Sequence, residues 1–366
     1  MSRKQKNSDV PVTPETLPEI PESEAWTYQI EGMKAPIIGK PVENAGVKKA
    51  VVIAVLIVAI GLSIFFSVRA IHSETFNFTQ TEAGWELTKF SNPGDITELT
   101  LDCAENDSAK PLTSIREYAF NCDDKLTSIT VGKDVREIDS KSFYSVWNLQ
   151  TIFVDPANEW YCDVDGVLYD KAQTRVICYP IDHDAYLREK AGYKEELWPD
   201  SEGYDDAYVA AVQTYHLPAT VETVGALAFN YANLTTVYLP AGLKTIETLA
   251  FFKSTNLKTI YTEGAGGVLR SLPDGLEAIG SDAFSYDQAL EYMYIPASVK
   301  TIGHHAFWDT CFKEDGEVKG VSVMHTALDE AQFKASVETG DHWLPSYDYR
   351  LFKKTIDVDY GAERAQ

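Results

Sequence analysis

The stretch LPAGLKTIETLAFFKSTNLKTI, residues 239–260, contains a spacing that recurs along the chain. In it Ile246 follows Leu243 by three positions, and Phe251 comes five positions later. The same spacing occurs at Leu112-Ile115-Phe120, Val135-Ile138-Phe143, Val221-Val224-Phe229, Leu276-Ile279-Phe284 and Val299-Ile302-Phe307. Successive phenylalanines are separated by 23, 86, 22, 33 and 23 residues. Self-similarity at a period in the twenties indicates a solenoid, and solenoids commonly form extended binding surfaces.

Each repeat also contains a short segment in which apolar and polar residues alternate. In the repeat at 234–239, Leu234, Val237 and Leu239 follow an L-x-x-I-x-L pattern that predicts a strand. Pro240 follows directly, and proline ends a strand because it has no N–H to donate to a ladder. One repeat cannot bury its own apolar side, so we expect stacked coils with a parallel sheet along one face and a phenylalanine from each coil in the core.

These residues resemble a known family. The segments LPAGLKTIETLAFFKSTNLKTI (239–260) and IPASVKTIGHHAF (295–307) are similar to BspA-like leucine-rich repeats. The segment NEWYCDVDGVLYDKAQTRVICYP (158–180) resembles an insertion common in that family. The resemblance covers about residues 96–311 apart from much of 181–211. It implies an α/β-type leucine-rich-repeat solenoid, mostly β, on a cell surface, with a role in recognition or adhesion.

Residues 50–68, AVVIAVLIVAIGLSIFFSV, form an uncharged run long enough for a transmembrane helix. Lysines before the run outnumber the single Arg69 after it, so we expect the N-terminus in the cytoplasm and the repeats outside. Cleavage after Ala70 is the alternative. Residues 1–49 are rich in proline and poor in large apolar residues, which predicts a disordered cytoplasmic tail.

The rest of the chain divides by pattern. We expect an N-terminal cap at 72–95, where Trp85, Leu87 and Phe90 would cover the first coil. The solenoid would run over 96–323, with strand spacing continuing through Val318, Val321 and Val323. An insertion at 155–211 would begin with a hairpin, GVLYD, a turn at KAQT and RVICYP. A C-terminal cap at 324–366 would hold a short helix near ALDEAQFKASV.

Composition and motifs exclude several functions. The formal net charge is −23, which disfavours a nucleic-acid partner. The chain lacks G-x-S-x-G, H-E-x-x-H, P-loop and G-x-G-x-x-G motifs, so we expect no enzyme activity and no cofactor. His304 and His305 fit variable solvated positions better than metal ligands. The Asp182-His183-Asp184 run lacks a third group of ligands in sequence, so we expect no metal site there.

The five cysteines, an odd number, exclude a dense disulfide scaffold. Cys162 and Cys178 flank the predicted DGVLY hairpin, and the sequence leaves open whether they pair or stay as buried thiols.

One outward-facing column of the predicted sheet is rich in aromatic residues. The position between the last two buried aliphatics of each strand points away from the core. In order it reads Thr100, Thr130, Phe153, His216, Tyr238, Tyr261, Tyr294 and Ser322, with Tyr292 in the neighbouring column. Stacked strands would place these side chains about 4.8 Å apart. They would form either a ligand-binding stripe or ordinary cross-strand packing.

The sequence therefore predicts a membrane-anchored surface protein that binds an extracellular protein or glycan. The candidate ligand-binding residues are Phe153, His216, Tyr238, Tyr261, Tyr292 and Tyr294. Two alternatives remain: an envelope scaffold that positions other surface proteins, and a hydrolase with its site in the 181–211 insertion. Converging carboxylates near the insertion would favour the hydrolase, and an open aromatic face would favour binding.

Overall fold

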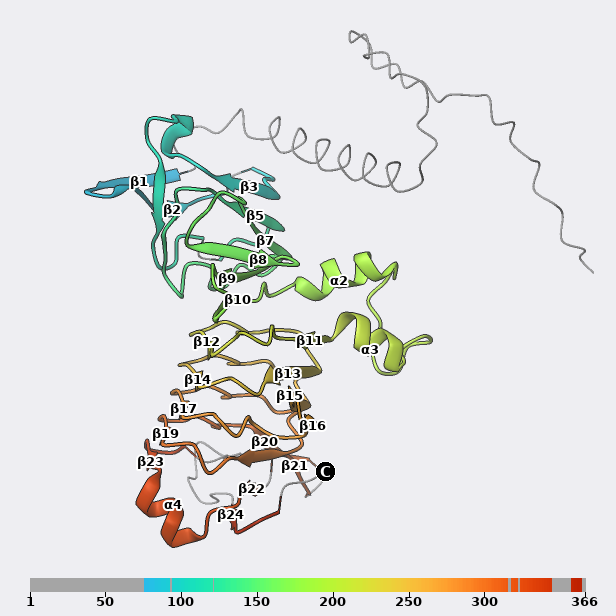
Figure 1. Ribbon diagram of the computed structural model, residues 1–366. Coiled ribbons are helices and arrows are strands. Elements are labelled where there is room, and N and C mark those ends of the chain that lie inside the picture. The colour runs from blue at the N-terminus through green and yellow to red at the C-terminus, as the bar shows by residue number, and fades with distance from the viewer. Residues whose placement is uncertain are drawn as a thin grey trace, which may run out of the picture. The chain divides into compact units, whose positions relative to one another are not determined.

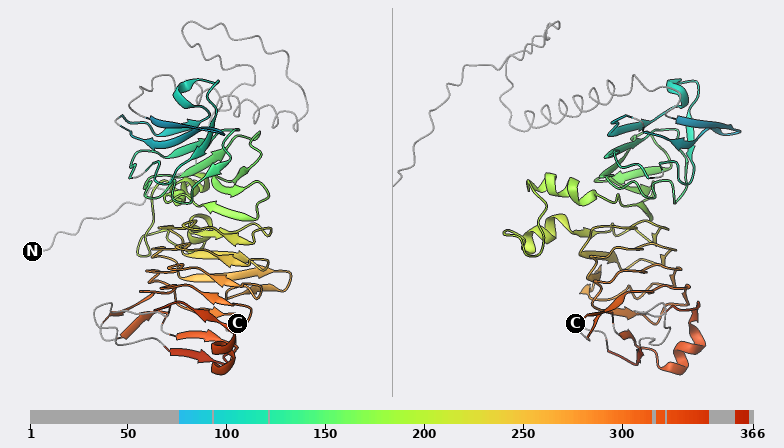
Figure 2. Two further views of the ribbon diagram at one scale, coloured as in Figure 1. Left: turned by 90° about the vertical axis from the view of Figure 1, so that its left-hand side faces the viewer. Right: turned by 180° about the vertical axis from the view of Figure 1, so that it is seen from behind.

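The computed structural model describes residues 76–92, 94–120, 122–314, 317–321, 323–343 and 357–363. Within them the chain winds into a solenoid built mostly of strands, with few helices (Figures 1 and 2). Each regular coil contributes one longer strand to one face, here called the front, and one short strand to the opposite face, the back. Of the predicted segments, 1–49 and 50–68 lie outside the described residues. In the part described, no helix is long and apolar enough to cross a bilayer.

The front strands match the predicted alternating segments. They are β3 (Glu98–Leu101), β5 (Ser128–Val131), β7 (Thr151–Val154), β11 (Thr214–His216), β13 (Thr236–Pro240), β15 (Thr259–Gly264), β18 (Met293–Ile295), β22 (Val323–Thr326) and β24 (Asp357–Tyr360). We expected one continuous parallel sheet, but the front has three sections, β3-β5-β7, β11-β13-β15-β16 and β18-β22-β24. The insertion separates the first two. The extra strand β16 (Gly267–Leu269) folds back antiparallel on β15 and ends the second section.

The back strands carry the isoleucine or valine of the repeat, except β23 (Glu338–Thr339), which has Thr339 opposite Ile302. They are β4 (Leu112–Ile115), β6 (Glu137–Ile138), β12 (Thr223–Val224), β14 (Thr245–Ile246), β17 (Ala278–Ile279), β19 (Thr301–Ile302) and β23 (Glu338–Thr339). They lie in two sheets, β1-β2-β4-β6 and β23-β19-β17-β14-β12-β10-β9-β8. The first begins with the hairpin of β1 (Phe76–Thr81) and β2 (Gly84–Phe90), whose Leu87 and Phe90 are buried in the same core as Phe120.

The repeat phenylalanines stack on one another through the core. The Phe229 and Phe251 rings lie 5.0 Å apart, and Phe251 and Phe284 lie 5.2 Å apart, with nearly parallel planes. Phe307 continues the row at 5.2 Å, and all four rings are fully buried. The residue spacing within each repeat thus places one aromatic ring at the equivalent core position of each of these coils, as the sequence predicts.

The insertion begins with strands that take the place of a regular coil. β8 (Tyr161–Val164) and β9 (Val167–Asp170) form a hairpin, and β10 (Arg175–Cys178) pairs antiparallel with β9, as the sequence predicts. β10 also pairs in parallel with β12. Tyr179 then stacks on Phe229 at 5.2 Å, and its N–H donates to the Ala228 carbonyl as that of Phe229 does to Ala250. Tyr179 therefore fills the phenylalanine position of a shortened coil.

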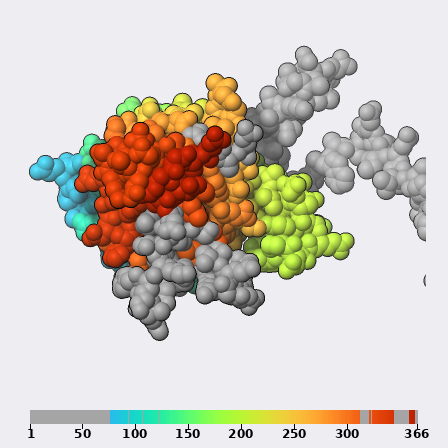
Figure 3. All heavy atoms as spheres, turned by 90° about the horizontal axis from the view of Figure 1, so that it is seen from below, coloured from blue at the N-terminus to red at the C-terminus, as the bar shows by residue number. Residues whose placement is uncertain are grey.

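The second half of the insertion is helical. α2 (His183–Ala191) and α3 (Asp206–Val212) pack on each other and project from the side of the solenoid (Figures 1 and 3). α2 ends at Gly192, which adopts the left-handed conformation common after helices. α3 begins at Asp205, whose carboxylate accepts from the Tyr208 N–H.

The C-terminal end differs from the predicted strand register. Val318 lies in β21 (Glu317–Gly320), which pairs antiparallel with β20 (Cys311–Glu314) instead of joining the front sheet. The next front strand is β22. The sequence predicted Ser322 in the position next to Tyr294, but His325, three residues later, occupies it. β23 then pairs with β19, so the repeat pairing continues beyond 323. The expected helix is α4 (Glu330–Ser336), which carries a capping box from Asp329 and Gln332.

Cys162 and Cys178 do not form a disulfide. The two residues lie on β8 and β10, with β9 between them. Two strand spacings of about 4.8 Å place their backbones roughly 9 to 10 Å apart. That separation is beyond the Cα distance of about 7 Å that a disulfide can span.

Candidate functional site

Three residues of the predicted column form a continuous ring stack on the front of the solenoid. His216, Tyr238 and Tyr261 occupy equivalent positions on β11, β13 and β15, where the strands pair in parallel. Val237 and Ile260, beside these tyrosines in sequence, are buried in the core. The alternation of a strand therefore turns the three rings outward. We call His216, Tyr238 and Tyr261 the front stack.

The rings of the front stack lie face to face. The His216 and Tyr238 centroids are 4.0 Å apart with planes 5° from parallel, and the Tyr238 and Tyr261 centroids are 5.0 Å apart at 21°. Because Tyr238 is covered on both faces by its neighbours, it presents its edge and hydroxyl to solvent. Burial, together with the nearby Tyr261 and Glu263, raises the pKa of Tyr238, so its hydroxyl stays protonated and can donate a hydrogen bond.

A carboxylate lies at the edge of the front stack. Glu263, two residues beyond Tyr261 on β15, has its Oε2 atom 2.7 Å from Nδ1 of His216. The side chains of both residues are about half exposed, at 56% for His216 and 45% for Glu263. The stack thus combines apolar ring edges, two phenol hydroxyls and an accessible carboxylate, which is a suitable set of groups for recognising a polar ligand.

Phe153 does not belong to the front stack. It lies on β7, in a different section of the front, where it pairs with Thr130. Its side chain is accessible, as expected, with 37% exposed. The aromatic column is therefore interrupted between Phe153 and His216, because the insertion enters the chain between their strands.

Tyr294 contradicts the expectation of an accessible stripe. It is only 4% exposed, and its neighbours on β18, Met293 and Ile295, are buried as well. An outward position stays open only where no other part of the chain packs over it, and β18 is enclosed on both sides. Tyr294 also pairs with His325 of β22, not with Ser322.

Tyr292 takes part in a second group on the front. Its ring lies 5.0 Å from that of His325, and Nδ1 of His325 is 3.0 Å from Oδ2 of Asp359. The Arg270 guanidinium lies 5.6 Å from the centre of the Tyr292 ring and 2.9 Å from the Glu291 carboxylate. The front therefore has two places where a histidine stacks on a tyrosine and contacts a carboxylate.

The Asp182-His183-Asp184 run of the insertion hydrogen-bonds to the repeats. Nδ1 of His183 is 2.7 Å from the Gln150 carbonyl, and Asp184 accepts from Asn233 at 3.0 Å, so both anchor α2 to the repeats. Burial raises the pKa of Asp184 to about 6. In the residues that the structure describes, no three histidine, cysteine or acidic side chains converge to hold a metal ion.

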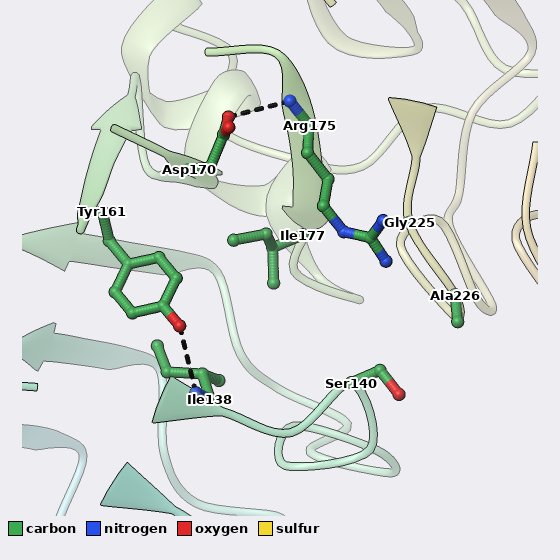
Figure 4. Close-up of a pocket in the computed structure, with 8 residues that line it drawn as sticks. All are labelled: Ile138, Ser140, Tyr161, Asp170, Arg175, Ile177, Gly225 and Ala226. Atoms are coloured by element: carbon green, nitrogen blue, oxygen red, sulfur yellow. Dashed lines mark hydrogen bonds between the residues drawn. The ribbon is translucent and has the colours of Figure 1, made fainter. Parts of the chain in front are cut away.

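A cavity of about 250 Å³ lies near the start of the insertion (Figure 4). The carboxylate, guanidinium and phenol groups of its lining already have structural partners. The Asp170 carboxylate accepts from the Arg175 backbone N–H at 2.8 Å, and the Arg175 guanidinium pairs with both oxygens of Glu247. The Tyr161 hydroxyl accepts from the Ile138 N–H at 3.1 Å. With Asp170 as its one carboxylate, the lining does not offer the pair that a glycosidase needs.

Two further side-chain clusters were missed by the sequence reasoning. Lys253 lies 5.2 to 5.5 Å from the ring centres of Tyr231, Phe252 and Tyr286, at the turns that follow the core phenylalanines. At the C-terminal turns, His342 lies within 5.7 Å of His305 and 6.2 Å of His304, between ring centres. The sequence signal for the first cluster is an aromatic residue one or two positions after most of the repeat phenylalanines, at Tyr231, Phe252 and Tyr286.

Comparison with known proteins places this solenoid in a family. The sequence profile described as "BspA type Leucine rich repeat region" matches six copies, over residues 49–159 and 207–313. The match spans more than half of the chain, which therefore belongs to the BspA-type leucine-rich repeat family. Proteins built of such repeats generally serve protein binding or adhesion rather than catalysis. No curated protein matches the sequence.

Several solved structures are similar to this chain. The pneumococcal vaccine antigen PcpA is 18% identical, with 69% of this chain and 68% of that chain covered and a TM-score of 0.40. A leucine-rich repeat protein from Bacteroides ovatus is 14% identical, with coverages of 78% and 74% and a TM-score of 0.37. The leucine-rich repeat protein of T. pallidum is 14% identical, with coverages of 79% and 86% and a TM-score of 0.31.

Proposed function

We propose that this protein is a membrane-anchored cell-surface receptor or adhesin that binds an extracellular protein or glycan. The observation that carries the proposal is the front stack, three outward rings on adjacent strands of a solenoid. Aromatic side chains supply a large contact area at low conformational cost, and tyrosine adds a hydroxyl for hydrogen bonding. The family to which the chain belongs supports a binding role over a catalytic one.

Membrane anchoring is the second part of the proposal. Its support is the uncharged run at 50–68 and the excess of lysine before it, which favours a cytoplasmic N-terminus and an extracellular repeat domain. An acidic solenoid on a cell surface would stay well solvated and would be repelled by anionic lipid.

The proposal is tested by removing rings from the front stack. The full-length protein in detergent is screened against arrays of extracellular proteins and glycans, and the best ligand is titrated against the Tyr238→Ser/Tyr261→Ser variant. We expect at least a tenfold loss of affinity. Stability should fall only modestly, because exposed cross-strand pairs contribute about 0.2–1 kcal/mol each.

The matched control is Tyr118→Ser, which removes an exposed ring from a turn away from the front stack. This variant should bind like the unmodified protein. Normal binding by a folded double variant would move the site away from the front stack, with the α2–α3 insertion and its exposed Trp198 as the next place to examine.

A further inference from the structure

The outward positions of the front strands carry an unusual balance of charge. In the part of the chain whose side chains are described, none of them is lysine or arginine. They hold three carboxylates, Glu98, Glu263 and Asp359, and otherwise threonine, serine, valine, proline, histidine and aromatic residues. Since the whole chain carries a formal charge of −23, long-range attraction also favours a cationic partner.

The front already holds one cation of this chain, Arg270, against a tyrosine ring and a carboxylate. Arg270 follows β16, and continuing the antiparallel register of β15 and β16 by one residue puts it opposite Tyr261. Its guanidinium lies over the Tyr292 ring at 5.6 Å and donates to Glu291 at 2.9 Å. A cation held between a tyrosine ring and a carboxylate is thus compatible with the geometry of this face.

The front stack offers the same two groups to a ligand. Glu263 uses one hydrogen bond to His216, and a carboxylate has about four acceptor positions. The tyrosine rings lie beside this carboxylate on the same face of β13 and β15. A ligand ammonium or guanidinium could therefore pair with Glu263 while its alkyl chain lies along the ring edges.

From this arrangement we infer that the front stack binds a cationic peptide segment and that Glu263 pairs with a lysine or arginine side chain of that segment. The inference rests on the proposed function and adds the chemical class of the ligand. It also assigns Glu263, which the sequence reasoning did not single out, as a specificity-determining residue.

The test compares two matched probes on the full-length protein in detergent. One is a fluorescent peptide of Gly-Ser-Lys repeats, and the other has each lysine replaced by glutamine. Fluorescence anisotropy should show at least tenfold tighter binding of the lysine peptide, weakening as salt is added. Glu263→Gln should reduce the affinity for the lysine peptide about five- to tenfold and leave the glutamine peptide unaffected.

The control separates a specific carboxylate from the general acidity of the chain. Glu277→Gln removes a carboxylate that pairs with Lys300 and lies next to the back strand β17, and it should change the affinity less than twofold. Equal losses for Glu263→Gln and Glu277→Gln would overturn the inference, as would equal binding of the two peptides. If both peptides bind equally yet both lose affinity in Tyr238→Ser/Tyr261→Ser, the proposed function stands and only the ligand class is wrong.

Discussion

At the scale of single residues, Asp287 differs in its hydrogen bonding from the aspartate at the equivalent position of an earlier repeat. It lies three positions after Phe284, where the earlier repeat has Asp123. The Asp123 carboxylate accepts from the N–H groups of Lys125 and Leu126, both at 2.8 Å. Asp287 is fully buried, and its two oxygens make no hydrogen bond of good geometry among the described residues, although the nearby Ser254 backbone partly favours the ionised form. Burial raises the pKa of Asp287 well above its ordinary value, so this carboxyl stays protonated in the folded protein.

The substitution Asp287→Asn should stabilise the protein at neutral pH. The folded pKa lies above the unfolded one, so the native state loses stability as pH rises past about 4, where the unfolded carboxyl ionises. Asparagine has nearly the same shape and does not ionise, so the variant does not lose stability in this way as pH rises. Urea denaturation should show a gain of more than about 1 kcal/mol at pH 7 and a smaller gain at pH 4.5. A gain that does not change with pH would mean that Asp287 is ionised in the native state.

At the scale of the structural element, the stacked phenylalanines show what holds the coils together. Phe251 lies between Phe229 and Phe284, at 5.0 and 5.2 Å. The insertion does not end this row, because Tyr179 occupies the next position on Phe229. Since neighbouring coils share the rings, a change in one coil affects the packing of the next.

Removing one ring from the row of stacked phenylalanines should therefore lower the stability of the fold substantially. We expect Phe251→Ala to lower the free energy of unfolding by about 3–5 kcal/mol, because it leaves a cavity between two coils. His304→Ala, at an exposed turn position, should cost less than about 0.5 kcal/mol. Chemical denaturation of the two variants measures both effects. Equal losses at the two positions would show that the assigned repeat register is wrong.

At the scale of the whole molecule, the repeat domain contains two buried clusters that meet at β9. Leu168 belongs to the cluster with Phe120, whereas Val167 and Tyr169 belong to the cluster with Phe229. Successive side chains of a strand point to opposite sides, so one four-residue strand can join the two cores. The insertion thus links the early repeats to the later ones.

The proposed anchoring is also a property of the whole molecule. Protease added to intact cells should remove everything beyond about residue 72 and leave the N-terminal tail protected, because only the repeat domain would be outside. Immunoblots with antibodies to the tail and to the repeats measure this directly. A repeat domain recovered from the medium with Ile71 as its first residue would indicate cleavage after Ala70 instead.

The amino-acid sequence by itself determined the repeat register as far as Phe307, the buried phenylalanine of each of those coils and the outward direction of His216, Tyr238 and Tyr261. These features depend on spacing within one repeat, where the period of a strand decides which side chain faces the core. For the same reason the hairpin of GVLYD and RVICYP and the helix near 330–336 were predictable, since their signals lie within a few residues.

Only the tertiary structure decided which outward residues share an open face. Tyr294 has the same local pattern as Tyr261, yet it is buried because other parts of the chain pack against its strand. Likewise, Tyr179 stacks on Phe229 at the end of the row of core phenylalanines. Glu263 contacts His216, which lies 47 residues earlier in the chain, and His342 lies beside His305. Each of these contacts joins different coils, and their geometry depends on where the insertion and the β15–β16 hairpin interrupt the stacking.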